Sequence, residues 1–191
     1  MRFFTNHIPT KPALSLEKWI KQAFENEWFD DENGQTYWGR RASGVLFTRN
    51  HPNFGWQLLA TKRSLDVEEP NTWGVTGGAI PAHEDDSFAS AMRETMEEIG
   101  TVPQNYRLID EYVWQAPNGT FTYTTYIVEV LDLAWEDYQF NWEVTDAKWV
   151  SIEDAHQLDL HPGFSELLAS MGTKIFGQGN KQSDPYNQEE R

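Results

Sequence analysis

The chain reads Gly77-Gly78-Ala79-Ile80-Pro81-Ala82-His83-Glu84 and, after eight intervening residues, Arg93-Glu94-Thr95-Met96-Glu97-Glu98-Ile99-Gly100, and this segment carries most of its structural information. The pattern over residues 87–99 predicts a helix whose apolar face comprises Ala89, Met92, Met96 and Ile99. Gly100 follows where helices commonly end in the left-handed conformation. We therefore expect a loop followed by a helix that packs against a core.

Three glutamates crowd one edge of this predicted helix. Glu97 and Glu98 lie three and four residues after Glu94, the spacing at which side chains on a helix are neighbours. Like charges so placed destabilise an isolated helix, and near its C-terminal end the helix dipole disfavours them further. A cation would offset both costs, and carboxylate oxygens prefer hard cations such as Mg²⁺, Mn²⁺ or Ca²⁺. The alternative interpretation is a solvated acidic face.

The segment resembles the Nudix box, whose template is Gly-x5-Glu-x7-Arg-Glu-U-x-Glu-Glu-x-Gly-U, where U is aliphatic. The chain supplies its fixed residues as Gly78, Glu84, Arg93-Glu94, Glu97-Glu98 and Gly100. It departs from the template in two ways. Eight residues separate Glu84 from Arg93, and the U positions are Thr95 and Thr101. Either the loop bulges by one residue, or Asp85 takes the place of Glu84.

The resemblance implies a fold, an activity and a set of metal ligands. The fold would be an α+β Nudix-type α/β/α sandwich with a mixed sheet between helices. The activity would be hydrolysis of a nucleoside diphosphate linked to another moiety, assisted by Mg²⁺ or Mn²⁺. Glu94, Glu97 and Glu98 would become metal ligands, one of them serving instead as general base, and the backbone carbonyl of Gly77 would be a further ligand.

The other box residues would have structural roles. Glu84 either completes metal binding or holds Arg93. Arg93 is then the cation that keeps the glutamates in place. Gly78 and Gly100 would set the turns on either side of the helix. These roles follow from the resemblance alone.

Further candidates lie outside the box. Glu143 precedes a strand ending in an aromatic residue, where the family often places an additional catalytic or metal-binding carboxylate, and Asp146 is a weaker candidate for that role. Arg63, with Lys62, ends a predicted strand and either contacts phosphates or meets solvent. Trp73 either stacks on a base or belongs to the core, and the same alternatives apply to Phe54, Trp56, Trp114 and Tyr123. His83 lies in the box loop, whereas His51, His156 and His161 are interpreted as structural.

The remaining sequence suggests one domain with extensions. We expect an N-terminal helical extension over residues 1–38, with its helix at 14–29, a Nudix hydrolase domain over 39–175 and a polar, disordered tail over 176–191. Residues 42–48 and 56–63 predict one hairpin, with a loop at 49–55. Residues 106–115 and 121–131 predict another. The N-terminal extension is available for a homodimer interface or a substrate lid.

Composition excludes several classes of function. The chain has 191 residues and a net charge of −15, which disfavours a broad nucleic-acid surface. It has no cysteine, which excludes disulfides, thiol nucleophiles and cysteine-ligated zinc and fits a cytoplasmic location. No secretory signal or membrane-spanning run is recognisable, so we expect no membrane partner.

Two interpretations of function remain open from the sequence. The first is a diphosphohydrolase acting on a small nucleotide, for example ADP-ribose, a nucleotide sugar, a dinucleotide or a modified nucleoside triphosphate. The second is a catalytically silent Nudix-like module that senses a nucleotide or binds a partner. The three intact box glutamates favour the first. A diphosphate isomerase on the same fold would need a reactive cysteine, which the chain lacks.

Overall fold

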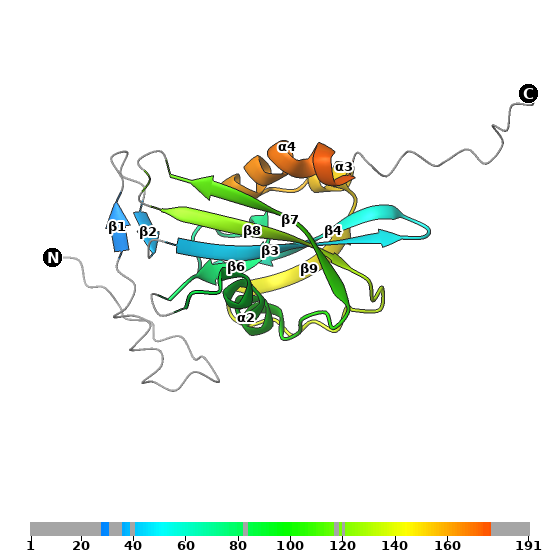
Figure 1. Cartoon of the computed structure of the whole chain (residues 1–191), viewed down its shortest axis with the longest axis horizontal. Coiled ribbons are helices and arrows are strands. Elements are labelled where there is room, and N and C mark those ends of the chain that lie inside the picture. Colours follow the sequence, from blue (N-terminus) through cyan, green and yellow to red (C-terminus); the bar gives the residue numbers. More distant parts are fainter. Residues whose placement is uncertain are drawn as a thin grey trace, which may run out of the picture.

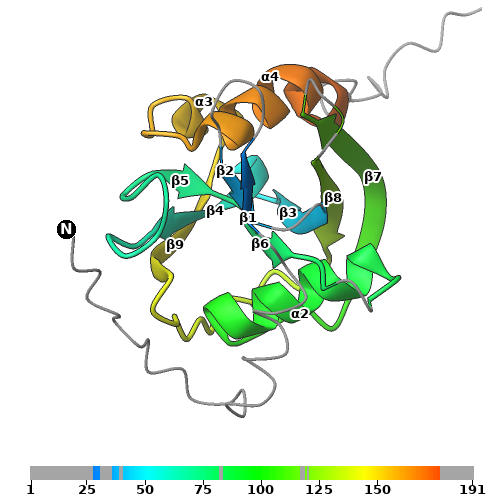
Figure 2. The same cartoon turned by 90° about the vertical axis from the view of Figure 1, so that its left-hand side faces the viewer.

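A mixed β-sheet lies between helix α2 on one face and helices α3 and α4 on the other (Figures 1 and 2). The structure, a computed structural model, describes residues 28–30, 36–38, 41–81, 84–116, 119 and 121–176. The strands of the large sheet are β3 (Arg41–His51), β4 (Gly55–Arg63), β5 (Trp73–Gly74), β6 (Thr76–Ala79), β7 (Tyr106–Gln115), β8 (Thr122–Val130) and β9 (Val144–Val150). The helices are α2 (Ser87–Ile99), α3 (Ile152–Ala155) and α4 (Pro162–Phe176). The expected α+β sandwich is confirmed.

Strand β3 organises the sheet. The strand order is β5-β4-β3-β8-β7, with β6 also paired to β3 and β9 also paired to β4. The pairing of β3 with β8 is parallel, whereas β3 pairs with β4 and β6 in antiparallel fashion. Every residue from Ala42 to Arg49 is buried, as expected for a central strand covered on both faces.

The two faces of β3 belong to two cores. Leu46 packs with Leu58, Ile127 and the α4 residues Leu167 and Leu168. On the opposite face, the neighbouring positions Val45 and Phe47 pack with Val128 and with Ala91 and Ile99 of α2. Side chains alternate between the faces of a strand, so β3 contributes to both cores. It thereby connects helix α2, which carries the glutamates, to the core beside α4.

Helix α2 begins and ends where the sequence predicts. The Asp86 side chain caps it by accepting a hydrogen bond from the Ala89 N–H at 3.0 Å, and Gly100 ends it at φ 75°. The predicted apolar face is partly wrong, because Met96 is 46% exposed and Ala89 is exposed. The buried face comprises Ser90, Ala91, Glu94, Thr95, Glu98 and Ile99.

Thr95 explains how this face is buried without an aliphatic residue at the first U position. Its hydroxyl donates to the Ala91 carbonyl at 3.0 Å and lies 2.7 Å from the Thr76 hydroxyl. The side chain is fully buried and has its polar atom satisfied. Thr95 thereby ties α2 to β6, the strand that carries Gly77 and Gly78.

Two predicted boundaries are wrong. Strand β3 continues through the predicted 49–55 loop to His51, because Arg49 and Asn50 pair with Gln57 and Trp56 and the Arg49 Nε also donates to Gln57 at 2.9 Å. Trp28 and Phe29, the last residues of the predicted 14–29 helix, belong to strand β1 (Trp28–Asp30), which pairs antiparallel with β2 (Thr36–Trp38). Aromatic residues favour strands, which accounts for this error. The rest of that helix and the C-terminal tail lie outside the described residues.

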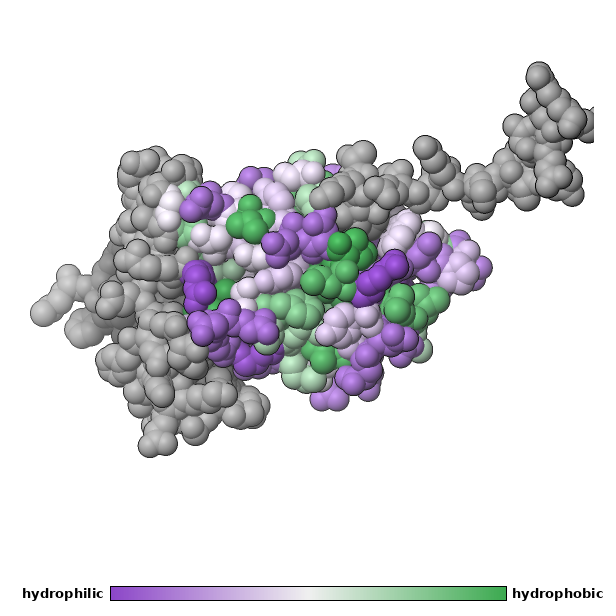
Figure 3. Space-filling model, in the orientation of Figure 1, coloured by the Kyte–Doolittle hydropathy of each residue, from purple (hydrophilic) through white to green (hydrophobic). Residues whose placement is uncertain are grey.

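Strand β7 forms an edge of the sheet and carries exposed apolar side chains, among them Leu108, Ile109 and Val113. Figure 3 shows apolar and polar residues intermixed on this side of the molecule. The β7–β8 register shifts between Leu108 and Asp110, and such a bulge makes an edge strand a poorer template for another strand. The homodimer stays a prediction.

No helix within the described ranges is long and apolar enough to cross a bilayer.

Gly100→Ala is expected to destabilise the protein more than Gly55→Ala. Both glycines have left-handed φ values, 75° and 68°, at which a β-carbon costs about 1 kcal/mol. At Gly100 the added carbon would also lie 2.8 Å from the Gln139 Cβ, whereas at Gly55 it would meet nothing within 4 Å. Urea unfolding of both variants measures the difference, and equal losses would contradict a tight contact between the end of α2 and residue 139.

Candidate active site

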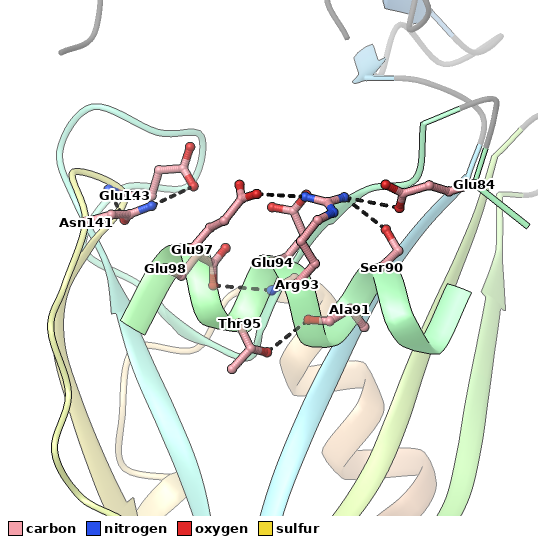
Figure 4. Close-up of polar contacts among 11 residues, drawn as sticks. Glu84, Ser90, Ala91, Arg93, Glu94, Thr95, Glu97, Glu98, Asn141 and Glu143 are labelled. Carbon is pink, nitrogen blue, oxygen red and sulfur yellow. Dashed lines mark hydrogen bonds and ion pairs between the residues drawn. The ribbon is translucent and has the colours of Figure 1, made fainter. Parts of the chain in front are cut away.

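Arg93 holds the acidic edge of α2 together (Figure 4). Its Nη1 donates to Glu94 Oε1 at 2.7 Å and to Glu97 Oε1 at 3.2 Å. Its Nη2 donates to Ser90 Oγ at 3.2 Å and to Glu84 Oε2 at 3.4 Å. One guanidinium therefore contacts three carboxylates, the geometry for which its planar fork is suited.

The contact with Glu84 answers the question raised by the extra loop residue. Glu84 reaches Arg93 despite the longer spacing, while Asp85 is exposed and Asp86 caps the helix. The extra residue in the segment between Glu84 and Arg93 therefore does not prevent their contact. The first alternative, a loop longer by one residue, matches this arrangement.

Gly78 allows strand β6 to lie close to the glutamates, and Gly77 bonds to one of them. The Gly77 N–H donates to Glu98 Oε2 at 3.3 Å. A β-carbon on Gly78 would lie 2.7 Å from the carboxyl carbon of Glu94, so a larger residue there would displace that side chain. Glu94 and Glu98 are 8% and 7% exposed, which places both carboxylates in a poorly hydrated environment.

This environment raises the pKa values of the two buried carboxylates, Glu94 and Glu98. Burial raises the pKa of Glu98 well above its usual range, and the charges of Glu94 and Glu143 raise it further. Burial also raises the pKa of Glu94, although Arg93 opposes the effect. For Arg93, burial alone would lower the pKa, but the charges of Glu94, Glu84 and Glu97 outweigh it and raise the pKa. The edge thus carries more negative charge than Arg93 balances.

The loop that carries Glu143 is hydrogen-bonded to the end of α2. The N–H groups of Gln139 and Asn141 donate to the carbonyls of Ile99 and Glu98 at 2.8 and 2.9 Å. The Asn141 Oδ1 accepts from the Glu143 N–H at 2.7 Å, and its Nδ2 donates to Glu143 Oε2 at 3.5 Å. Glu143 is thereby brought close enough for its charge to affect the pKa of both Glu94 and Glu98.

Asn141 was not among the residues that the sequence singled out. The available signal was its position two residues before Glu143, since Asn side chains commonly bond the backbone two residues on. Asp146 has a different setting. It lies in β9 opposite Lys62, and its Oδ1 accepts the N–H of Ala147.

Of the predicted substrate contacts, the structure brings Arg63 to this edge. Its Nε donates to the Glu68 carbonyl at 2.8 Å, and its charge lowers the pKa of Glu98. Trp73 is 8% exposed and belongs to the core beside α4, with the Lys148 ammonium 4.2 Å from its ring centroid. That position matches the core alternative for Trp73, and stacking on a base stays a prediction.

The other candidates are dispersed. Phe54 is 69% exposed at the β3–β4 turn, where its ring lies 4.7 Å from that of His51. His161 accepts the Gly163 N–H at Nδ1, a structural contact. Trp114 and Tyr123 pack against Ala42, Ala116 and Phe121. His83 lies outside the described residues.

The carboxylates suit a divalent cation chemically, although their present hydrogen bonds point them elsewhere. Within the described residues, no three carboxylate or histidine side chains converge on one point. The reason is that Arg93 engages Glu94 and Glu97 while the Gly77 N–H engages Glu98. The donors are hard oxygens, the kind that Mg²⁺ and Mn²⁺ prefer, and they carry uncompensated negative charge.

Comparison with known proteins places the chain in a family. The model of the NUDIX domain matches residues 38–171. A putative 8-oxo-dGTP diphosphatase 3 from Mycobacterium tuberculosis is 31% identical over 143 residues, covering 72% of this chain and 64% of the relative. An Escherichia coli 8-oxo-dGTP diphosphatase is 26% identical over 68% of this chain and 93% of its own length. A crystal structure of RenU, a Nudix hydrolase from M. smegmatis, matches with a TM-score of 0.68 and 27% identity over 78% of this chain and 96% of that chain.

The chain therefore belongs to the Nudix family. The fold and the arrangement of the box helix agree with that membership. The chain spans just under two thirds of the length of the M. tuberculosis relative.

Proposed function

We propose that the protein hydrolyses a nucleoside diphosphate linked to another moiety, using Mg²⁺ or Mn²⁺. The observation that carries the proposal is the edge of α2. Arg93 joins Glu94 and Glu97 there, Glu98 accepts the Gly77 N–H, and the charge of Glu143 acts on Glu98. Two relatives are named diphosphatases, which supports the same reaction class.

Each residue would have a definite task in the reaction. Glu94, Glu97, Glu98 and the Gly77 carbonyl would hold the metal, which when bound supplies positive charge and Lewis acidity next to the diphosphate. A carboxylate of the same edge takes one proton from the attacking water. One of the three glutamates would serve as this base instead of binding the metal. Glu98 is the first choice, because a general base is most effective when its pKa is raised towards the working pH, and Glu143 is the second choice.

The bond changes follow from this arrangement. The water oxygen forms a bond to one phosphorus, and the bridging P–O bond on that phosphorus breaks. The departing phosphate or nucleotide keeps the bridging oxygen. Arg63, whose charge lowers the pKa of Glu98, would bind a phosphate oxygen, since a guanidinium matches phosphate geometry.

The substrate we favour first is an oxidised nucleoside triphosphate. The support is the name of the two relatives, 8-oxo-dGTP diphosphatase. The box residues act on the diphosphate and not on the base, so ADP-ribose, nucleotide sugars and dinucleotides belong in the same comparison.

Product release over a substrate panel tests the proposal. Phosphate and nucleotide products would be separated after incubation with 8-oxo-dGTP, dGTP, ADP-ribose, a nucleotide sugar and a dinucleoside polyphosphate. Each compound would be tested with Mg²⁺, with Mn²⁺ and with chelator. We expect turnover of one compound class, abolished by chelator. Binding of a nucleotide without any turnover would favour the silent sensing module instead.

A further inference from the structure

Tyr123 brings a hydroxyl group to the strand that carries Gly77. It lies in β8, paired with Ala42 of β3, and its ring packs among Ala42, Ala116 and Phe121. Tyr123 and Ile127 are four residues apart on one strand, so they share a face of the sheet. Ile127 packs in the core beside α4, so Tyr123 approaches Gly77 from the face opposite α2.

The phenol oxygen occupies the space that two glycines leave open. A β-carbon on Gly77 would lie 2.6 Å from the Tyr123 hydroxyl oxygen, and one on Gly44 would also overlap it. Gly44 and Gly77 pair across β3 and β6. The Gly77 N–H is also the donor to Glu98. The hydroxyl therefore lies against the residue that borders the glutamate edge.

Charges of both signs, those of Glu98 and Glu94 and that of Arg63, act on the same hydroxyl. Burial raises the pKa of Tyr123 well above its usual range, the charges of Glu98 and Glu94 add to this, and Arg63 opposes it. A phenol hydroxyl is a hydrogen-bond donor, so this group can donate to an acceptor beside Gly77.

This hydroxyl differs from those of other tyrosines in the domain. The hydroxyls of Tyr112 and Tyr138 donate to Glu166 and to the Trp135 carbonyl, and that of Tyr126 bonds to Ser87. Within the ranges that the structure describes, no residue accepts a hydrogen bond from Tyr123. A donor next to a cluster of anions and one guanidinium is suited to an anionic oxygen of a ligand.

We propose that the Tyr123 hydroxyl donates a hydrogen bond to a phosphate oxygen of the substrate, on the side of Gly77 opposite the glutamates. Arg63 would bind the same diphosphate from the end of β4. This inference rests on the proposed function, because it specifies how the diphosphate is held. Tyr123 would thus bind the phosphates of the substrate, a role that differs from both alternatives its sequence offered, base stacking and core packing.

Tyr123→Phe tests the proposal, since it removes one oxygen and keeps the ring in place. The matched control is Tyr112→Phe, which removes a hydroxyl from the neighbouring strand that donates to the exposed Glu166. The probe is methylenediphosphonate, a non-hydrolysable diphosphate, titrated calorimetrically in the presence of Mg²⁺. KM and kcat would also be measured for whichever panel compound the wild type hydrolyses.

We expect Tyr123→Phe to raise both the Kd for methylenediphosphonate and KM by about tenfold or more, with kcat changed by less than about threefold. Tyr112→Phe should match the wild type. Mn²⁺ affinity without diphosphate should be equal in all three proteins, which distinguishes a contact to the diphosphate from a change in the carboxylates.

An unchanged Kd in Tyr123→Phe, or an equal rise in both variants, would overturn the inference. If the wild type binds methylenediphosphonate but hydrolyses no panel compound, the proposed function fails while the binding comparison still decides the role of Tyr123. If the wild type does not bind the probe, the KM comparison decides the role of Tyr123, and an unchanged KM in Tyr123→Phe overturns the inference while the product-release panel alone decides the proposed function.

Discussion

Glu98→Gln is expected to lower kcat by about a thousandfold while the protein stays folded. Glutamine has nearly the shape of glutamate and still offers an oxygen to the Gly77 N–H. The glutamine side chain is uncharged, so it offsets less of the charge of a metal ion and cannot take a proton from water. Steady-state kinetics on the best panel substrate, with saturating Mg²⁺, measure the loss.

The control for this variant is Glu111→Gln, which removes one charge from an exposed position on edge strand β7. It should retain wild-type kcat. Near-normal turnover in Glu98→Gln would move the proton-accepting role elsewhere, and Glu143 would be the next residue to replace.

The same variant should have a distinct pH signature in its stability. The pKa of Glu98 is raised in the folded protein, so the fold favours the protonated carboxyl. Its stabilising contribution is complete below the ordinary carboxyl pKa and is lost as the pH rises through the folded-state pKa. In metal-free solution at pH 8, Glu98→Gln should therefore have a higher Tm than the wild type, and at pH 4 the difference should shrink. If Glu98→Gln had a lower Tm than the wild type at pH 8, the carboxylate of Glu98 would not be an uncompensated charge in the folded protein.

Arg93→Met is expected to lower the free energy of unfolding by about 3 kcal/mol at pH 8 and to reduce turnover as well. It would leave Glu84, Glu94 and Glu97 without their shared cation, and Glu94 is largely buried. The loss should be smaller at pH 5, because the raised pKa of Glu94 lets that carboxyl accept a proton. Saturating Mn²⁺ should restore part of the stability by supplying positive charge at the same edge.

Arg107→Met provides the comparison for the Arg93 variant. Arg107 pairs with Glu129 across β7 and β8, but its side chain is 68% exposed, so its removal should cost less than about 1 kcal/mol. Urea unfolding with and without Mn²⁺ measures both variants. Similar losses for Arg93 and Arg107, or no restoration by Mn²⁺, would contradict the role given to Arg93.

The order of elements was predictable because local signals agree with the final structure. Asp86 and Gly100 bound α2, and the strands at 106–115 and 121–131 were predicted nearly to the residue. The i, i+3 and i, i+4 spacing correctly placed three glutamates on one edge. The helix face was less predictable. Residue type favoured Met96, but the buried position is taken by Thr95, whose hydroxyl is satisfied by Thr76 in a different element.

The parts of the site that the sequence did not predict depend on contacts between distant segments. Asn141 positions Glu143 only because loop residues 139–141 bond to the last carbonyls of α2. The Tyr123 hydroxyl reaches Gly77 only because β8 and β6 both flank β3. Neither contact leaves a periodic pattern along the chain. Trp28 and Phe29 show the converse error, where helical spacing was outweighed by strand pairing.

Direct titration of Mn²⁺ into the metal-free protein tests whether the α2 edge is a metal site, independently of any substrate. Isothermal titration calorimetry at pH 8 would compare the wild type with Glu98→Gln and Glu111→Gln. We expect the wild type and Glu111→Gln to bind Mn²⁺ with equal affinity and Glu98→Gln to bind at least about tenfold more weakly, because the α2 edge then carries one negative charge fewer. Equal binding in all three proteins would place the metal, and with it the proposed hydrolysis, away from these carboxylates.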